Sequence, residues 1–118
     1  MSEAVARADP RSASPPETRM RLGLAAEGVP AAVPQLELLD ARGWSVAHVD
    51  LGWEKAKVAA EYQGDHHRTD REQWMRDQAR FAELASAGWL VLPCTAVDLR
   101  FPHAFAVRVL AALAERAR

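Results

Sequence analysis

Cysteine is almost absent from this chain. Among 118 residues there is one, Cys94, so no internal disulfide bond can form. One cysteine and 4 histidines also provide no C-x-x-C pair and no Cys/His spacing typical of structural zinc sites. A chain without disulfides or zinc ligands fits a reducing compartment, and we therefore expect a cytoplasmic protein.

Long apolar runs and an excess of one charge are absent as well. No run approaches the ~20 apolar residues of a membrane-spanning helix, and the first residues, MSEAVARADPRSASPPE, lack the apolar segment of a signal peptide. The 15 basic and 16 acidic residues give a formal net charge of -1, which provides no global attraction to nucleic acid or to a membrane surface. Contact with DNA would need a local basic patch, and the candidates for it are Arg19, Arg21, Arg71 and Arg76.

What the chain does contain is enough apolar material for a core. The apolar fraction is 49%, and the length suits one domain of ordinary size. Residues 1–13 are small, polar and mixed in charge, so we expect them to form a flexible arm or the remnant of a linker. The folded domain is expected over residues 14–118.

The first half of the domain predicts a helix followed by strands. Ser14 and Glu17 form an S-x-x-E capping box, which predicts a helix that ends near Gly28. Three strands in an antiparallel meander should follow, with a tight turn at Asp40 to Gly43 between the first two. Their expected ranges are residues 34–40, 44–53 and 57–63.

The second half predicts helices around one further strand. A helix over residues 70–87 should place Trp74 and Phe81 on its inner side. The wholly apolar stretch WLVLP, residues 89–93, suggests a central strand covered on both faces, and a closing helix should follow from Phe101. The predicted fold is therefore α/β, in the order α-β-β-β-α-β-α, with a mixed four-stranded sheet flanked by helices.

Two carboxylates flank the second turn of the meander. Asp50 and Glu61 should lie nearly opposite each other if that turn is centred near residues 54–57, with Cβ atoms about 5 Å apart. Carboxylates that close repel each other unless a proton or a cation lies between them. Hard oxygen ligands suit Mg²⁺ or Mn²⁺, and such a site could hydrolyse a phosphodiester. The alternative is that both are solvated charges at strand ends.

Four stretches, in this order, resemble one family: SPPETRMR, VDLGW, AAEYQGDHHRTD and PCTAVDL. They are similar to the small domain related to very-short-patch-repair (Vsr) endonucleases, which is common in actinobacterial proteins of unknown function. The resemblance covers residues 12–113 and implies the restriction-endonuclease-like core of the PD-(D/E)xK superfamily, acting on DNA. Such domains often follow a winged-helix or antitoxin-like domain, so a recognition domain or partner protein outside this chain is also implied.

The resemblance assigns roles to individual residues. It implies a Mg²⁺ or Mn²⁺ site, whose ligands are Glu17, Asp50 and Glu61. The histidine after the glycine turn corresponds to His67, which would transfer a proton or contact phosphate. Gln63 stands where the wider motif has its catalytic lysine, and it could hydrogen-bond a ligand water or face solvent. The threonine of the late strand corresponds to Thr95.

The missing lysine leaves alternatives open. Lys57 could replace it or could be a plain solvated lysine, and Glu17 could be only a capping residue. The function predicted first is a metal-dependent DNA endonuclease. The alternative is a catalytically weak or inactive nuclease-fold module that binds or regulates within a defence or toxin-antitoxin-like system.

Overall fold

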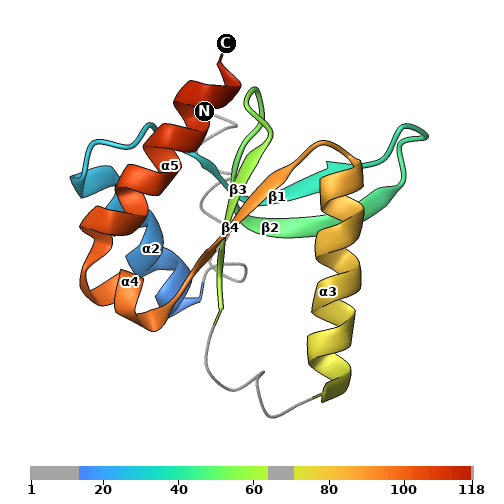
Figure 1. Cartoon of the computed structure of the whole chain (residues 1–118), viewed down its shortest axis with the longest axis horizontal. Coiled ribbons are helices and arrows are strands. Elements are labelled where there is room, and N and C mark those ends of the chain that lie inside the picture. Colours follow the sequence, from blue (N-terminus) through green and yellow to red (C-terminus); the bar gives the residue numbers. More distant parts are fainter. Residues whose placement is uncertain (1–13, 64–70, 118) are drawn as a thin grey trace.

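The computed structural model describes residues 14–63 and 71–117, which form an α/β fold with a mixed four-stranded sheet flanked by helices (Figure 1). The predicted class and order are confirmed, and α4 is an additional short helix before the closing one. In chain order the elements are α2 (Pro15–Ala26), β1 (Val33–Leu39), β2 (Ser45–Trp53), β3 (Val58–Tyr62), α3 (Arg71–Ser86), β4 (Leu90–Cys94), α4 (Ala96–Arg100) and α5 (Pro102–Arg116).

Local signals explain where α2 and the first hairpin begin and end. The Ser14 hydroxyl accepts the Glu17 N–H at 3.2 Å and caps α2. Gly28, just past the end of α2, has a φ of 86°, which a residue with a Cβ adopts only under strain. In the turn between β1 and β2, the Asp40 carboxylate accepts backbone N–H groups of Arg42 and Trp44 at 2.9 and 3.0 Å. The predicted helix end and the predicted tight turn are thus both confirmed.

The sheet order corrects one prediction. The strands lie in the order β1-β2-β3-β4, antiparallel except for the parallel pair of β3 with β4 that the crossover through α3 permits. The apolar stretch that forms β4 therefore lies at the edge of the described sheet, and Leu90 is 37% exposed. The buried central strand is β3, where Val58, Ala59 and Ala60 are 0% exposed. A short apolar run alone could not distinguish the two positions, and Pro93, which has no N–H to donate, suits an edge.

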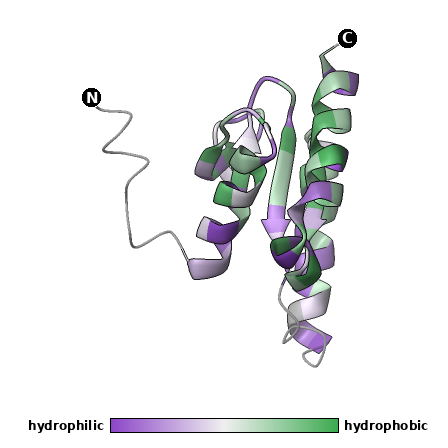
Figure 2. Ribbon diagram, turned by 90° about the vertical axis from the view of Figure 1, so that its left-hand side faces the viewer, coloured by the Kyte–Doolittle hydropathy of each residue, from purple (hydrophilic) through white to green (hydrophobic). Residues whose placement is uncertain are grey.

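Two hydrophobic cores lie on opposite sides of the sheet, with α2, α4 and α5 on one side and α3 on the other (Figure 1). The helix α5 is largely hydrophobic along its length (Figure 2), and it contributes four buried residues to the first core. The buried residues of this α2/α5 core are Met20, Leu24, Val29, Leu51, Trp53, Val58, Ala60, Cys94, Phe105, Ala106, Val109 and Ala112. Those of the α3 core are Leu38, Ala47, Val49, Ala59, Leu84 and Trp89.

The first hairpin passes from one core to the other at Asp50. Side chains two positions apart in a regular strand face the same side of a sheet. In β2, however, Val49 belongs to the α3 core, whereas Leu51 belongs to the α2/α5 core. The paired strand β1 shows the reason, because it pairs on both sides of Gln35 but not at Gln35, which has a φ of 51°. Gln35 and Asp50 therefore face each other at a twist in the hairpin.

The inner side of α3 was predicted incorrectly at its start. Leu84 is buried and Phe81 is half-buried, but Trp74 is 51% exposed. Figure 1 shows the first turns of α3 extending away from the strands, so the helix packs on the sheet through its C-terminal half. Periodicity indicates which residues share a face, but not how much of that face is covered.

Candidate functional site

Asp50 and Glu61 are brought together where the pairing of β2 with β3 ends. The register pairs Leu51 with Ala60, so the next position places Asp50 opposite Glu61. At that point hydrogen bonds to side chains replace the regular backbone hydrogen bonds between the two strands. The Asp50 N–H donates to Glu61 Oε2 at 3.1 Å, and the Tyr62 N–H donates to Asp50 Oδ2 at 2.8 Å. Each carboxylate is thus held by the backbone of the other strand.

Glu17 reaches the same place from the first turn of α2. Its N–H donates to the Ser14 hydroxyl, but its carboxylate is directed elsewhere, since Oε1 accepts the Gln35 amide at 2.8 Å. The same Gln35 Nε2 lies 3.5 Å from Asp50 Oδ1. The capping role weighed for Glu17 therefore accounts for its backbone and not for its side chain. One amide group joins carboxylates from a helix and a strand.

The electrostatics of Asp50 follow from this crowding. Its pKa is raised from 3.8 to about 6, mainly by burial and also by the charge and hydrogen bonding of Glu17. The Tyr62 N–H and the charge of Arg80 act in the opposite direction. A carboxyl group with a pKa near 6 exchanges its proton close to neutral pH.

Glu61 has a different surrounding. Its Oε1 lies 2.6 Å from Nη2 of Arg80 in α3; the Glu61 side chain is 8% exposed and that of Arg80 is 29% exposed. Burial raises the pKa of Glu61, the hydrogen bond from Arg80 lowers it, and the charge of Asp50 raises it again. Arg80 therefore neutralises the one buried acidic residue among those the structure describes. Glu61 is bound on one side by an arginine and on the other by the Asp50 backbone.

Gln35 and Arg80 were not among the residues that the sequence indicated. For Arg80 a signal existed, because Leu84 and Phe81 place the inner side of α3 near it, and a buried glutamate requires a partner. For Gln35 there was none, because a left-handed residue inside a strand leaves no trace in the pattern of apolar residues.

Three of the remaining predicted residues are described, and each makes a hydrogen bond outside the Glu17–Asp50 pair. Gln63 is half-buried, and its N–H donates to the Cys94 carbonyl at 2.8 Å. Thr95 caps α4, with Oγ1 accepting the Asp98 N–H at 3.3 Å. The Lys57 amine donates to the Ala87 carbonyl at 3.2 Å, near the end of α3 and the turn end of the hairpin, so it does not replace the missing lysine. His67 lies outside the described residues.

The donor set can be compared with what Mg²⁺ or Mn²⁺ requires. Within residues 14–63 and 71–117, no group of three or more His, Cys, Asp or Glu side chains is arranged to hold a metal. Mg²⁺ is commonly bound through one or two carboxylates, with water and phosphate at the other positions. Glu17 and Asp50 provide two carboxylates, whose oxygens lie 2.8 and 3.5 Å from the same amide nitrogen of Gln35. The ion pair with Arg80 makes Glu61 a weaker candidate for direct ligation.

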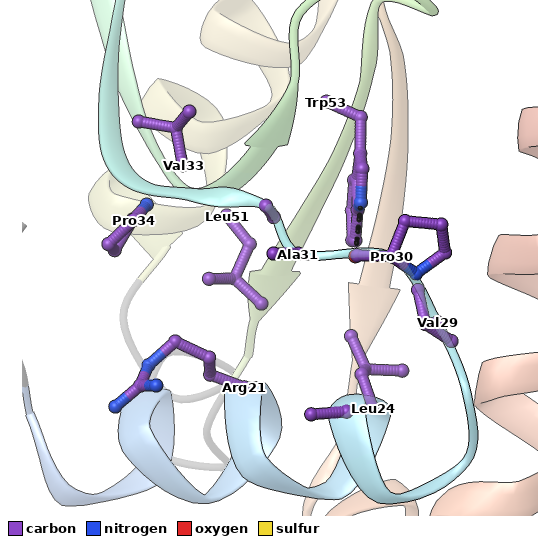
Figure 3. Close-up of a pocket in the computed structure, with 11 residues that line it drawn as sticks. Arg21, Leu24, Val29, Pro30, Ala31, Val33, Pro34, Leu51 and Trp53 are labelled. Atoms are coloured by element: carbon purple, nitrogen blue, oxygen red, sulfur yellow. Dashed lines mark hydrogen bonds between the residues drawn. The ribbon is translucent and has the colours of Figure 1, made fainter. Parts of the chain in front are cut away.

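An apolar cavity lies beside the Glu17–Asp50 pair. Its volume is about 760 Å³, and it lies between α2 and the segment that leads into β1 (Figure 3). Its lining includes Arg21, one helical turn after Glu17, and Leu51, next to Asp50. Trp53 closes one wall through a 2.9 Å hydrogen bond to the Pro30 carbonyl (Figure 3). The lining contains no carboxylate, so the cavity offers contact area beside the site rather than reactive groups.

The described helices include none that is long and apolar enough to cross a membrane.

Sequence comparisons identify relatives without a known function. No family model matches the chain. The chain is 32% identical over 113 residues to the uncharacterized proteins MT2308 and Rv2248 from two strains of Mycobacterium tuberculosis; the match covers 94% of this chain and 41% of each relative. The chain thus spans about two fifths of the length of these curated relatives.

One solved structure is similar over most of the chain. It is the catalytic domain of the homing endonuclease I-Bth0305I, with a TM-score of 0.63 and 19% identity, covering 90% of this chain and 100% of that domain. At this identity the likeness establishes the fold: the chain has the α/β architecture of an endonuclease catalytic domain.

Proposed function

We propose that this domain is a metal-dependent DNA endonuclease that hydrolyses phosphodiester bonds, in the manner of the Vsr-like branch. The observation that carries the proposal is the meeting of Glu17 and Asp50, two carboxylates from different elements, around one amide group. Their position at the end of a β2–β3 pairing, on a fold shared with an endonuclease catalytic domain, supports nuclease chemistry over a chance cluster of charges.

Each residue of the site would have its own role in the hydrolysis. Glu17 and Asp50 would hold Mg²⁺ or Mn²⁺, which when bound supplies an activated water and offsets charge on the phosphate. The Tyr62 N–H holds the Asp50 carboxylate in a single orientation, at 2.8 Å. Glu61 accepts the Asp50 N–H and so fixes the backbone from which that carboxylate projects. His67 is proposed to transfer the proton, and Gln63 to hydrogen-bond a water at the site.

Arg80 would supply the positive charge that the missing lysine leaves unfilled. It is bound to Glu61, it lowers the pKa of Asp50 through its charge, and 29% of its side chain remains exposed. A partly exposed guanidinium beside a carboxylate cluster can contact a phosphate without leaving its ion pair, because it carries five N–H donors. The proposed substrate is therefore DNA, with the phosphate between the Glu17–Asp50 pair and Arg80.

A second candidate function has one observation in its favour. Glu61 is occupied by Arg80, and Gln63 replaces the motif lysine, so the site could bind DNA and cleave it weakly or not at all. The domain would then be a binding or regulatory module of a defence or toxin-antitoxin-like system. A recognition domain or partner outside this chain is compatible with either function, since the relatives are longer.

The decisive experiment compares cleavage with binding. The purified chain is incubated with duplex, nicked, mismatched and single-stranded DNA in Mg²⁺, in Mn²⁺ and in EDTA. We expect cleavage with metal only, its loss in Asp50→Asn, and its retention in Asp98→Asn, a matched carboxylate of the α4 cap. DNA binding without cleavage under all conditions would support the binding module instead.

A further inference from the structure

We propose that Gln35 is a positioning residue of the Glu17–Asp50 pair: its side-chain amide holds the two carboxylates side by side, where both can bind one cation. This inference rests on the proposed function, because it concerns the same site. It adds a residue to which neither the motifs nor the comparisons assign a role.

The backbone of Gln35 is the first argument. It lies inside β1 with a φ of 51°, and it is one of two described non-glycine residues with positive φ. That conformation is costly for a residue with a Cβ, and it persists only where the surrounding contacts impose it. β1 pairs with β2 on both sides of Gln35 but not at Gln35 itself.

A purely structural explanation would favour a different residue. The hairpin needs a twist here to pass between the two cores, and glycine provides positive φ without strain. Three other described positions with positive φ, in turns and after helix ends, are occupied by glycine: Gly28, Gly43 and Gly88. A glutamine at such a position therefore indicates that its side chain is needed.

The contacts of that side chain show what it does. Its Nε2 donates to Glu17 Oε1 at 2.8 Å and lies 3.5 Å from Asp50 Oδ1. A terminal amide nitrogen has two hydrogens, so it can serve one carboxylate with each. Glu17 is on α2 and Asp50 on β2, so Gln35 in β1 donates to carboxylates of two different elements, whose negative charges repel each other. Carboxylates held in this way are preorganised for a cation, without a backbone rearrangement on binding.

The test separates the side chain from the backbone. Gln35→Gly relieves the positive φ and removes the amide, whereas Gln35→Leu keeps the strain and the approximate size and also removes the amide. Mn²⁺ affinity is measured by calorimetry and metal-free stability by thermal melting in EDTA. The control is Gln78→Leu, an exposed glutamine on α3.

We expect both Gln35 variants to bind Mn²⁺ at least about tenfold more weakly, a loss of 1.4 kcal/mol in binding free energy. Gln35→Gly should nevertheless melt at a temperature equal to or higher than that of the wild-type chain in EDTA. A structural role alone cannot produce these opposite changes. Gln78→Leu should match the wild type in both measurements.

The outcomes are distinguishable. Wild-type Mn²⁺ affinity retained in Gln35→Gly overturns the role of Gln35 and leaves the proposed function standing. Failure of the wild-type chain to bind Mn²⁺ overturns both. If Gln35→Leu folds poorly, the Mn²⁺ affinity of Gln35→Gly still tests the role of the amide. A further variant, Gln35→Glu, is isosteric but lacks the donor and adds a charge. It should melt at a lower temperature than the wild-type chain in EDTA.

Discussion

The starts of α2 and α4 carry the same local motif and use it differently. At α4, Thr95 and Asp98 form a complete capping box, in which the Asp98 carboxylate accepts the Thr95 N–H at 2.9 Å. At α2, Ser14 caps the Glu17 N–H, but the Glu17 carboxylate extends to Gln35 and Asp50. One acidic residue completes its own helix, and the other is available to a site. The difference indicates that a capping motif fixes the backbone of its acidic residue but leaves the direction of the side chain open.

The two regions also differ in the ion pair that an arginine forms with the carboxylate. Arg80 pairs with the buried Glu61 at 2.6 Å, whereas Arg108, 52% exposed, lies 3.5 Å from Asp98. Asp98 keeps its Thr95 donors without the arginine, and Glu61 would keep only the Asp50 N–H. The comparison therefore predicts unequal effects for matched substitutions.

The largest effect is expected when the buried pair is broken. Arg80→Met should lower the free energy of unfolding by about 3 kcal/mol, because it leaves a buried carboxylate without its cation. Arg108→Met should cost no more than about 0.5 kcal/mol, as for other exposed pairs. Chemical denaturation at neutral pH measures both. The double variant Arg80→Met with Glu61→Gln should recover most of the loss, and equal losses in the two single variants would contradict the comparison.

The second effect concerns pH. The folded protein keeps a proton on Asp50 up to about pH 6, whereas the unfolded chain releases it near its ordinary pKa of 3.8. The folded state thus binds more protons in this window, so stability in EDTA should fall by about 2 kcal/mol as pH rises from 4 to 6 and then level off. Asp50→Asn should remove most of this fall, while the remaining fall comes from Glu61, whose pKa is also raised. Denaturation series at several pH values test this, with Thr95→Ala as the control that keeps the wild-type slope.

A smaller effect separates the two acidic residues of the capping motifs. Asp98→Ala should cost about 1 kcal/mol, because the Thr95 N–H loses its acceptor. Glu17→Ala should leave metal-free stability within about 0.5 kcal/mol of the wild type, since the repulsion of Asp50 disappears with the carboxylate. Of these two substitutions, only Glu17→Ala should abolish the rise in melting temperature that Mn²⁺ produces. A retained Mn²⁺ effect in Glu17→Ala would assign the metal to other residues.

The smallest difference between the two regions is expected for the hydroxyl groups that cap the helices. Ser14→Ala and Thr95→Ala each remove one hydroxyl acceptor at a helix start, which costs between about 0.5 and 1 kcal/mol. The Mn²⁺ effect should persist in both, because neither hydroxyl contacts the carboxylate pair. Melting curves with and without Mn²⁺ provide the measurement, and loss of the Mn²⁺ effect in Ser14→Ala would show that the cap and the site are coupled.

The meander was predictable because its signals are local. Apolar alternation, the Asp40 to Gly43 turn and the residues between Asp50 and Glu61 determine the register of β1 to β3, and the opposition of those two carboxylates follows from it. The edge position of β4 was not predictable, since a short apolar strand looks the same at an edge and in a centre. The inner side of α3 was only partly predictable, because its length exceeds the sheet that it covers.

The sequence by itself determined the elements other than the short α4, their order and the two opposed carboxylates, because each depends on residues near one another in the chain. Only the tertiary structure decided which groups those carboxylates meet. Gln35 comes to Glu17 and Asp50 through a twist between two cores, and Arg80 comes to Glu61 through the packing of α3 on the sheet. These contacts join residues that are distant in the chain, and the free energy that selects them comes from burying apolar surface in two cores and neutralising the charge that this burial encloses.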